Sequence, residues 1–349
     1  STRALSSAAS DVYKRQFHNI AEINGGVLYR IPLSVCDALS VPTFDADGKF
    51  LYDYSGHRAC ARTTVGAELR FCADGDGFTL RIATEKSVDV TVFNGDFQCA
   101  AVRTVPGENT LAFERGDAVK GVGARSRNRF AASLWRVCLD GDGDITFRSL
   151  EAENVRPPRA EELPRLRILA YGSSISQGCN SACQQLNYLS VCAQLLGADL
   201  ANKSIAGGCF CEKEMSDYLL SEPYDALYLE TGTNIADRPA AVIEERMGGL
   251  LRRACENAPG KPVFIVTPFP VFDEVSATAA PYRDNFARSR KVIEEVARSY
   301  KNAVLVEGRS LLDRDYYLCS DILHPSTFGQ AMMGVNAAAI LKKYLPVQK

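Results

Sequence analysis

The hydrophobic pattern of this chain changes its period near residue 150. Between residues 17 and 150, apolar residues alternate with polar ones, as at Phe78, Leu80 and Ile82. Such alternation is typical of strands with one face on a core and the other in water. Short strands of this kind, joined by tight turns such as Asn94-Gly95, predict an all-β sandwich.

Beyond residue 165, the pattern is that of an α/β domain. Apolar runs predict strands near 166–171, 199–203, 225–230, 263–267 and 303–307, and helical stretches lie between and after them, near 181–196, 212–220, 239–257, 282–300 and 327–344. Alternating units of this length predict a parallel sheet covered by helices on both faces. Ligands bind such sheets at the carboxyl ends of the strands, so functional residues are expected directly after them.

Two domains account for most of the 349 residues, a β-sandwich over 17–150 and an α/β domain over 165–349. Residues 151–164 carry three prolines among charged residues, and we predict a linker there. Residues 1–16, STRALSSAASDVYKRQ, are polar and without pattern. We expect them to be disordered or extraneous to the natural protein.

The charge and the apolar content exclude several classes of partner. The formal net charge of -2 offers no basic surface for nucleic acid. No apolar run approaches the ~20 residues that span a bilayer, and the N-terminus lacks the pattern of a signal peptide. We therefore expect a cytoplasmic protein, a location that a signal peptide on a missing natural N-terminus would change. The sequence predicts no oligomeric state.

Twelve cysteines are scattered through apolar patterns and are predicted to be mostly reduced core thiols. Two closer pairs stand apart, Cys179 with Cys183 and Cys209 with Cys211. Their spacing differs from that of zinc knuckles, so we predict packing beneath loops and no bound metal. The sequence leaves open whether these four thiols meet.

A second stretch resembles a metal-binding motif but lacks one of its required residues. Acidic residues from Asp140 to Glu151 fall at the first, third, fifth and twelfth positions of a calcium-binding EF-hand loop. The sixth position needs glycine but holds Ile145, and the flanking residues have the pattern of strands. A hairpin turn is the better prediction for this stretch.

A serine turn follows the first strand of the α/β domain. Gly172-Ser173-Ser174-Ile175 connects an apolar run to a plausible helix. A serine on a sharp strand-to-helix turn exposes its hydroxyl, so Ser174 is a candidate nucleophile for attack on an ester. Gly and Ser also form ordinary loops, and only matching residues elsewhere in the chain give this turn weight.

His324 is the candidate base for that serine. The other two histidines, His18 and His57, lie in the β-rich half of the sequence. Asp321, three residues before His324, can hold the imidazole through its Nδ1–H and leave Nε2 to accept the serine proton. In the alternative interpretation, Asp321 or Ser326 only caps the last helix.

Two more strand ends offer donors for an oxyanion. Gly207 follows the second strand, where glycine lets the backbone approach a substrate closely, and Asn234 follows the third strand with a side-chain amide. Together with the backbone N–H of Ser174 they would form an oxyanion hole with three donors. A flexible turn and a plain turn residue are the alternatives at these two positions.

These four blocks, in this order, resemble the SGNH hydrolase superfamily, also called GDSL esterases and lipases. The resemblance places the nucleophile on Ser174, the oxyanion donors on Gly207 and Asn234, and the Asp-x-x-His pair on Asp321 and His324. It covers roughly residues 165 to 345. It implies a flavodoxin-like, three-layer α/β/α fold, preceded here by a smaller, jelly-roll-like β-sandwich.

Two departures narrow the resemblance to one branch of the superfamily. Ser173 stands where the family usually has the aspartate of Gly-Asp-Ser, and Ile235 stands where an aspartate usually follows the asparagine. Both favour the branch with a Gly-Ser-Ser-Ile turn and an N-terminal β-sandwich. Members of that branch are commonly carbohydrate esterases that remove acetyl groups.

The expected function is a serine esterase that hydrolyses short acyl esters, above all O-acetyl esters of carbohydrates, through an acyl-enzyme intermediate and without a cofactor. A lipase or thioesterase for longer acyl chains is one alternative. A carbohydrate-binding protein that has lost catalysis is the other. No residue of the β-sandwich is assigned to the site, and its Trp135 is predicted to pack in the core.

Overall fold

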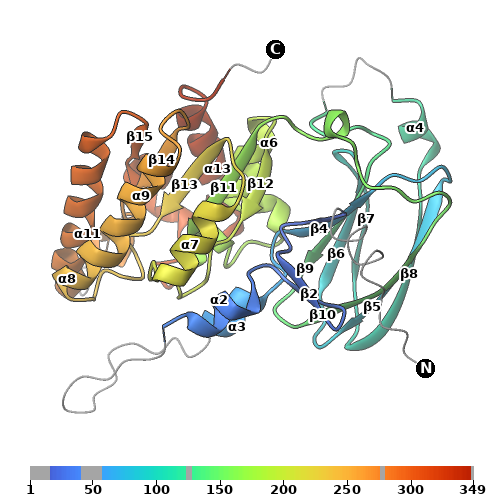
Figure 1. The fold of residues 1–349 in the computed structure, drawn as a ribbon, viewed down its shortest axis with the longest axis horizontal. Coiled ribbons are helices and arrows are strands. Elements are labelled where there is room, and N and C mark those ends of the chain that lie inside the picture. Colours follow the sequence, from blue (N-terminus) through green and yellow to red (C-terminus); the bar gives the residue numbers. More distant parts are fainter. Residues whose placement is uncertain (1–15, 41–56, 123–127, 276–279, 347–349) are drawn as a thin grey trace. The chain divides into compact units, whose positions relative to one another are not determined.

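The computed structural model describes residues 16–40, 57–122, 128–275 and 280–346 (Figure 1). The predicted tail therefore lies outside the described residues, apart from Gln16. The chain divides into two compact units, one made of residues 1–33 and 62–165 and the other of residues 34–61 and 166–349.

The first unit contains two antiparallel sheets of five strands each. In spatial order, the first sheet holds β1 (Phe17–His18), β4 (Ala67–Phe71), β9 (Trp135–Asp140), β6 (Asp89–Asn94) and β7 (Phe97–Arg103). The second holds β2 (Glu22–Asn24), β3 (Val27–Tyr29), β10 (Ile145–Glu151), β5 (Gly77–Thr84) and β8 (Gly107–Glu114). A short helix, α4 (Asp117–Lys120), and a 3-10 turn, η1 (Ala160–Glu162), complete the unit. This arrangement confirms the predicted all-β unit.

The core of this unit consists of the apolar residues that alternate along the strands. Trp135 is fully buried, with its ring 4.9 Å from that of Phe78 and 6.5 Å from that of Phe71. The predicted tight turn at Asn94-Gly95 connects β6 to β7, and Gly95 has a φ of 59°, which glycine adopts without strain.

The turn after Asp140 is not a hairpin turn, and that prediction was wrong. β9 and β10 belong to different sheets, so residues 141–144 carry the chain from one sheet to the other. A local turn pattern cannot distinguish these outcomes, because strand pairing is decided by the partners that each strand finds elsewhere. β9 pairs with β4 and β6, and β10 pairs with β3 and β5.

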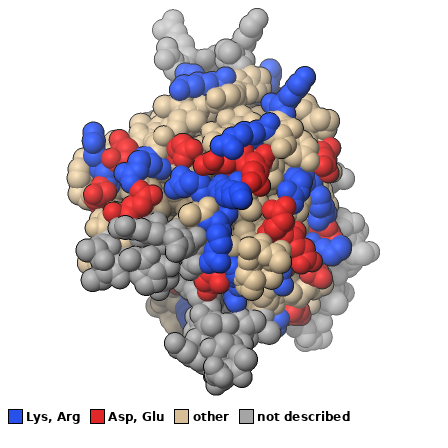
Figure 2. All heavy atoms as spheres, turned by 90° about the vertical axis from the view of Figure 1, so that its left-hand side faces the viewer, with Lys and Arg blue, Asp and Glu red and all other residues tan. Residues whose placement is uncertain are grey.

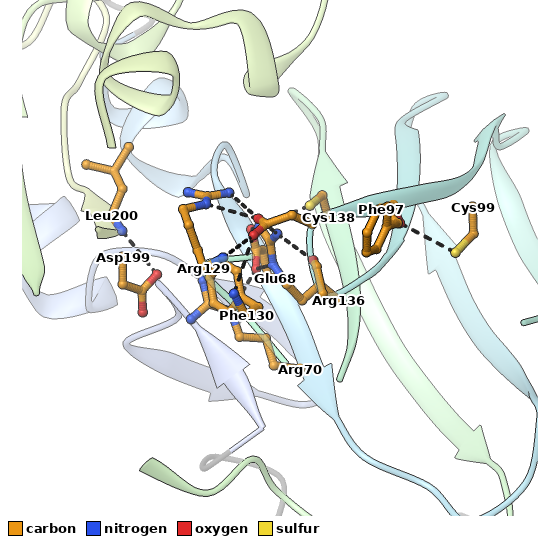
Figure 3. Close-up of polar contacts among 12 residues, drawn as sticks. Glu68, Arg70, Phe97, Cys99, Arg129, Phe130, Arg136, Cys138, Asp199 and Leu200 are labelled. Atoms are coloured by element: carbon orange, nitrogen blue, oxygen red, sulfur yellow. Dashed lines mark hydrogen bonds and ion pairs between the residues drawn. The ribbon is translucent and has the colours of Figure 1, made fainter. Parts of the chain in front are cut away.

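A buried ionic cluster lies on the first sheet (Figure 3). The Glu68 carboxylate accepts hydrogen bonds from Nε and Nη2 of Arg136, at 2.9 and 2.5 Å, and from Nε of Arg70 at 2.7 Å. The guanidinium of Arg136 also lies 4.0 Å from the centroid of the Phe130 ring. Burial would raise the pKa of Glu68, but Arg136 and Arg70 hold it well below its usual value.

The second unit is built on one parallel sheet of five strands. Their spatial order is β12 (Asp199–Asn202), β11 (Arg167–Gly172), β13 (Ala226–Glu230), β14 (Val263–Val266) and β15 (Ala303–Val306). The first strand in sequence thus lies between the second and the third, which is the flavodoxin-like order. Every residue of β13 and β14 is buried, as expected for strands covered on both faces.

Helices form a layer on each face of this sheet (Figure 1). One layer contains α6 (Tyr188–Leu195), α12 (Gly308–Leu311) and α13 (Thr327–Leu341). The other contains α7 (Lys213–Ser221), α8 (Ala240–Val242), the π-helical segment η3 (Ile243–Gly248), α9 (Gly249–Asn257) and α11 (Ala280–Ser299). The shorter elements are α2 (Leu33–Ala38), α3 (His57–Arg62), α5 (Ser174–Gln177), η2 (Gln184–Leu186), α10 (Phe272–Val275) and η5 (Asp315–Tyr317). The predicted three-layer fold is confirmed.

Two predicted helices differ from the observed ones. The helix predicted over 181–196 begins only at Tyr188, because the Asn187 side chain caps it by accepting from the N–H groups of Leu189 and Ser190. The helix predicted over 239–257 contains the π-helical segment, which ends at the Gly248-Gly249 pair. Two glycines lower the helical propensity there.

Residues 34–61 group with the second unit, whereas the hydrophobic pattern predicts them to be part of the sandwich. The Ser40 N–H donates to Oε1 of Glu212 at 2.8 Å, and Arg246 donates to the Ser40 hydroxyl at 3.0 Å. Residues 151–164 group with the first unit, where Arg156 forms a β-bridge with Cys72. The boundaries predicted at residues 150 and 165 otherwise stay a prediction.

The surface carries both signs of charge. On the face shown in Figure 2, Lys and Arg side chains are interspersed with those of Asp and Glu. Helices α9 and α11 carry ion pairs such as Arg252 with Glu244 and Arg298 with Glu294. Among the described residues, no helix has both the length and the apolar character that crossing a membrane requires.

Replacing Glu68 by alanine should destabilise the first unit by about 3–5 kcal/mol, because the buried Arg136 loses its close carboxylate partner and keeps the longer contact with Asp96, at 3.5 Å. Trp135 is the only tryptophan in the chain, so its fluorescence during denaturant unfolding reports on this unit alone.

The matched control is Glu108→Ala, which removes an exposed ion pair with Arg148 and should cost at most about 1 kcal/mol. Equal unfolding midpoints for the two variants would show that the buried cluster adds nothing to stability.

Candidate active site

The serine turn predicted from the sequence lies at the carboxyl end of β11. Ser173 caps the short helix α5, with its hydroxyl accepting from the N–H of Ile175, and the left-handed Gly178 ends that helix at a φ of 103°. Gly172 has no room for a side chain, since a Cβ there would lie 2.6 Å from Oγ of Ser176. The turn therefore requires glycine before the two serines, and Ser174 occupies the first position of the helix.

Ser174, His324 and Asp321 form a chain of hydrogen bonds. Oγ of Ser174 lies 2.8 Å from Nε2 of His324, and Nδ1 of the same ring lies 2.8 Å from Oδ2 of Asp321. The imidazole is thus held from both sides, 150 residues along the chain from the serine. The structure brings these three predicted residues together.

The loop that carries Asp321 and His324 is tightly held. Oδ1 of Asp321 accepts from the N–H groups of Leu323 and His324, both at 3.0 Å. Ile322 between them has a φ of 51°, a left-handed conformation that strains a β-branched residue. Strain of this kind persists only where the surrounding contacts impose it, and it is common at functional sites.

Helix α13 connects this loop to the serine turn. Ser326 caps the helix by accepting from the N–H of Gly329 at 3.2 Å. One turn further on, the buried Gln330 donates to the carbonyl oxygens of Ile175 and Cys179, at 3.2 and 3.4 Å. The helix therefore fixes the histidine loop and the serine turn to each other. Ser326 is the cap, while Asp321 contacts the histidine.

Asp321 is suited to orient a histidine ring. Partial burial raises the pKa of Asp321, but the hydrogen bonds from the His324 ring and from the N–H groups of Leu323 and His324 lower it by more. The net pKa therefore lies below the usual value. A carboxyl group with a lowered pKa stays ionised through the weakly acidic and neutral range. Asp321 therefore accepts the Nδ1–H of His324 throughout that range.

Gly207 and Asn234 lie on neighbouring loops of the second unit. Gly207 has a φ of 64°, in the left-handed region that favours glycine. Oδ1 of Asn234 accepts from the N–H of Cys209 at 3.2 Å, and this bond fixes which end of the amide is the oxygen. In the part of the chain that the structure describes, Nδ2 of Asn234 has no hydrogen-bond acceptor, so it can donate to a bound molecule.

Such an arrangement can perform acyl transfer. A neutral imidazole that accepts from a serine hydroxyl activates the oxygen for attack on a carbonyl carbon, and a free amide donor nearby can stabilise the resulting oxyanion. Hydroxyl, ring and carboxylate have the connectivity that this chemistry requires.

Two residues of this region were not predicted from the sequence, Glu230 and His57. Glu230, at the end of β13, accepts hydrogen bonds from Ser173, Ser176 and Thr233 around the serine turn. His57, which the sequence pattern assigned to the sandwich, is buried in the second unit, 5.8 Å from the Phe210 ring and against Gly208. Neither residue has a local motif. The available sequence signal was the position of Glu230, a charged residue at the end of the otherwise apolar strand predicted over 225–230.

The cysteines form no disulfide bond. Cys209 and Cys211 are buried, whereas Cys179 and Cys183 are partly exposed. Burial, followed by the neighbouring Cys211 thiol, raises the pKa of Cys209 well above its usual value, which makes it a poor thiolate donor to a metal. Among the described residues, no group of three or more His, Cys, Asp or Glu side chains could hold a metal ion.

Comparison with known families agrees with this geometry. Residues 170–332 match the model of the GDSL-like lipase/acylhydrolase family, a span that contains the serine turn and the His324 loop. This stretch of the second unit is therefore a GDSL-like domain. Members of the family hydrolyse carboxylic esters, and the chain is accordingly an ester hydrolase. No curated protein matches the chain in sequence.

Solved structures share the fold of the whole chain, the N-terminal unit included. The salicylyl-acyltransferase SsfX3 from a tetracycline biosynthetic pathway is 17% identical, with a TM-score of 0.73 over 95% of this chain and 96% of that one. A putative GDSL-like lipase from Bacteroides ovatus is 14% identical, with a TM-score of 0.63 over 94% of each chain. A family two carbohydrate esterase from Cellvibrio japonicus is also 14% identical, with a TM-score of 0.56 over 94% of this chain and 97% of that one.

If Asp321 orients the histidine in this GDSL-like domain, Asp321→Asn should lower kcat on a small acetyl ester by roughly 10³–10⁴-fold. The amide can present its NH₂ group to Nδ1, which favours the tautomer with the proton on Nε2, where it cannot accept from Ser174.

Asp313→Asn is the control, because Asp313 lies on the same stretch of chain and accepts a hydrogen bond from the Asn336 side chain at 3.3 Å. It should leave kcat unchanged. Similar rates for the two variants would exclude an orienting role for Asp321.

Proposed function

We propose that this chain is a serine esterase that removes short acyl groups, above all O-acetyl groups of carbohydrates, through an acyl-enzyme intermediate. One observation carries the proposal, the continuous chain from Ser174 Oγ through His324 to Asp321, with 2.8 Å at each step. A serine held in this way is able to attack an ester but has no evident structural purpose.

In the first half of the reaction, Nε2 of His324 takes the Ser174 proton while Oγ attacks the acyl carbon. The imidazolium, stabilised by Asp321, then gives that proton to the leaving alcohol oxygen as the ester bond breaks. In the second half, a water molecule repeats the attack on the acyl-serine. His324 takes a proton from that water as it attacks and gives it to Oγ of Ser174 when the bond between serine and acyl group breaks and the acid leaves. No cofactor takes part in either half.

The oxyanion formed in each half is proposed to bind between three donors. These are the backbone N–H of Ser174, the backbone at Gly207 and Nδ2 of Asn234. The hydrogen bond from Cys209 to Oδ1 of Asn234 supports this role, since it turns the NH₂ end of the amide away from the loop. Loss of one such donor typically lowers the rate by ~10²–10³-fold.

The proposed substrate class rests on the structural neighbours. Besides the Cellvibrio japonicus enzyme, a family two carbohydrate esterase from Clostridium thermocellum in complex with cellohexaose has a TM-score of 0.56 at 13% identity. Identities this low support the fold, so the acetylated carbohydrate is our inference. We likewise infer that the acyl pocket is short.

A second candidate is acyl transfer to an alcohol other than water. The similarity to SsfX3, described as a salicylyl-acyltransferase, favours it, because that structure aligns with nearly the whole chain. Both reactions share the acyl-enzyme and differ only in what attacks it. A carbohydrate-binding protein without catalysis is less well supported, because pure binding has no need for a serine hydrogen-bonded to a histidine. The cytoplasmic location stays a prediction, as does the absence of a metal or cofactor.

Replacing Ser174 by alanine should lower hydrolysis of a small acetyl ester by at least about 10⁴-fold, since the nucleophilic oxygen is removed. Thermal unfolding should be nearly unchanged because Ser174 is partly exposed. Ser221→Ala, at the exposed end of α7, is the control and should retain full activity. Undiminished turnover by the Ser174 variant would refute the mechanism.

The acyl group is tested by comparing acetyl with octanoyl esters of the same alcohol. A short pocket should favour acetyl by roughly tenfold or more in kcat/KM, whereas a lipase or thioesterase should prefer octanoyl. Release of acetate from acetylated mono- and oligosaccharides then tests the carbohydrate. Consumption of ester without free acetate, in the presence of an acceptor alcohol, would favour the acyltransferase instead.

A further inference from the structure

Glu230 is a buried carboxylate at the centre of the second unit. It is the last residue of β13, the strand between β11 and β14, and 1% of its surface is exposed. In the described part of the chain it forms no ion pair. Burying a carboxylate in this way costs free energy unless hydrogen-bond donors surround it.

Four donors converge on this carboxylate. Oε2 accepts from the Ser173 N–H at 2.9 Å, from the Ser173 hydroxyl at 2.5 Å and from the Ser176 hydroxyl at 3.0 Å. Oε1 accepts from the Thr233 hydroxyl at 2.9 Å. A carboxylate accepts through both oxygens, so one side chain joins two separate loops.

These two loops carry residues of the proposed site. Ser173 immediately precedes Ser174, and Ser176 lies in the same short helix. Thr233 immediately precedes Asn234. Glu230 therefore fixes the neighbour of the proposed nucleophile and the neighbour of a proposed oxyanion donor to a single point on the central sheet.

The third segment of the proposed oxyanion hole also reaches Glu230, through the main chain. The Cys209 thiol lies 3.6 Å from the carbonyl oxygen of Glu230, and the Cys209 N–H donates to Oδ1 of Asn234. Cys209 follows Gly207 by two residues. All three loops that would surround an oxyanion thus bond to one residue or its peptide.

The carboxylate is confined as well as bonded. A Cβ atom on Gly172 would lie 2.9 Å from its Oε2, so the turn passes as close as a glycine permits. Burial raises the pKa of Glu230, and the bonds from Ser173, Thr233 and Ser176 offset only part of that rise. The titratable groups facing it are Tyr188 on α6, Tyr228 on β13 and Cys209, all neutral acids at physiological pH.

We propose that Glu230 is a positioning residue, which aligns the Ser174 turn with the Asn234 segment so that the oxyanion donors meet at one point. The proposal rests on the proposed serine mechanism, because it assigns no chemical step to Glu230 itself. We expect loss of the Glu230 hydrogen bonds to lower the rate of catalysis more than it lowers the stability of the fold.

A pair of Thr233 variants tests this with little risk to the fold. Thr233→Ala removes the bond between Oε1 and the Asn234 segment, and Thr233→Ser restores the hydroxyl. We expect the alanine variant to lower kcat on an acetyl ester by about tenfold or more with KM changed less than about threefold, and serine to restore it.

Substitutions of Glu230 itself give the larger effect. Glu230→Gln can keep its oxygen at the Oε2 position, where three donors converge, and turn its NH₂ group toward the Thr233 oxygen. It should retain most of kcat. Glu230→Ala removes all four acceptor contacts and should lower kcat by ~10²–10³-fold, the effect of losing one oxyanion donor. If this variant does not fold, the Thr233 pair decides the question.

Glu307→Ala is the matched control. Glu307 directly follows β15 in the same sheet and accepts from the Thr267 hydroxyl at 3.1 Å, but it contacts none of the proposed site residues. It should lower the unfolding temperature without changing kcat.

Labelling of Ser174 by a fluorophosphonate, followed by mass spectrometry, separates this proposal from the proposed function. The probe needs an activated serine and an oxyanion hole but no particular substrate. A wild-type chain that does not react at all would overturn the serine mechanism. If the wild type reacts, slow labelling of the Thr233→Ala and Glu230→Ala variants supports the proposal. Labelling of both folded variants at the wild-type rate would overturn it.

Discussion

The second unit depends on satisfying polar groups that crowd at the carboxyl edge of its parallel sheet. Parallel strands end at the same edge, so the loops after β11, β12 and β13 bring serine, asparagine and glutamate side chains into one buried region. Each of these groups must find a partner there, because water is largely excluded. The hydrogen bonds that stabilise this edge also fix the relative positions of Ser174, Asn234 and the Gly207 loop.

Two glutamates with little exposed surface show how the neighbouring groups decide the pKa of the same kind of side chain. Glu68 in the sandwich lies between arginines, which hold its pKa well below the usual value. Glu230 is surrounded by hydroxyl and N–H donors, and its pKa is raised by burial. An arginine beside the serine turn would bring a full positive charge next to the imidazole. Neutral donors hold the turn without adding such a charge. Asp321 is then the charged group that contacts the His324 ring.

The fold and the proximity of Ser174, His324 and Asp321 were predictable from the sequence because both are signalled by local patterns. The period of the hydrophobic pattern predicts the strands. Ser174 lies in a short motif after a strand, and Asp321 and His324 lie in a short motif before a helix. Glu230 and His57 were not predictable, since their partners are distant in sequence and no motif surrounds them. The prediction of a hairpin turn between Asp140 and Asp144 was wrong for the same reason. Strand pairing decides between a hairpin and a crossing to the other sheet, and the turn sequence does not encode that pairing.

Residues 34–61 make the second unit discontinuous in sequence. A truncation that begins at residue 165 would keep every residue of the family match, and it would retain Ser174, Asp321 and His324. It would nevertheless remove His57 from the surface of Gly208 and Ser40 from Glu212, exposing the loop that carries Gly207. The hydrolase unit is therefore not a separable module of this chain. Removal of α3, which carries His57, would therefore alter a domain whose motifs begin more than a hundred residues later.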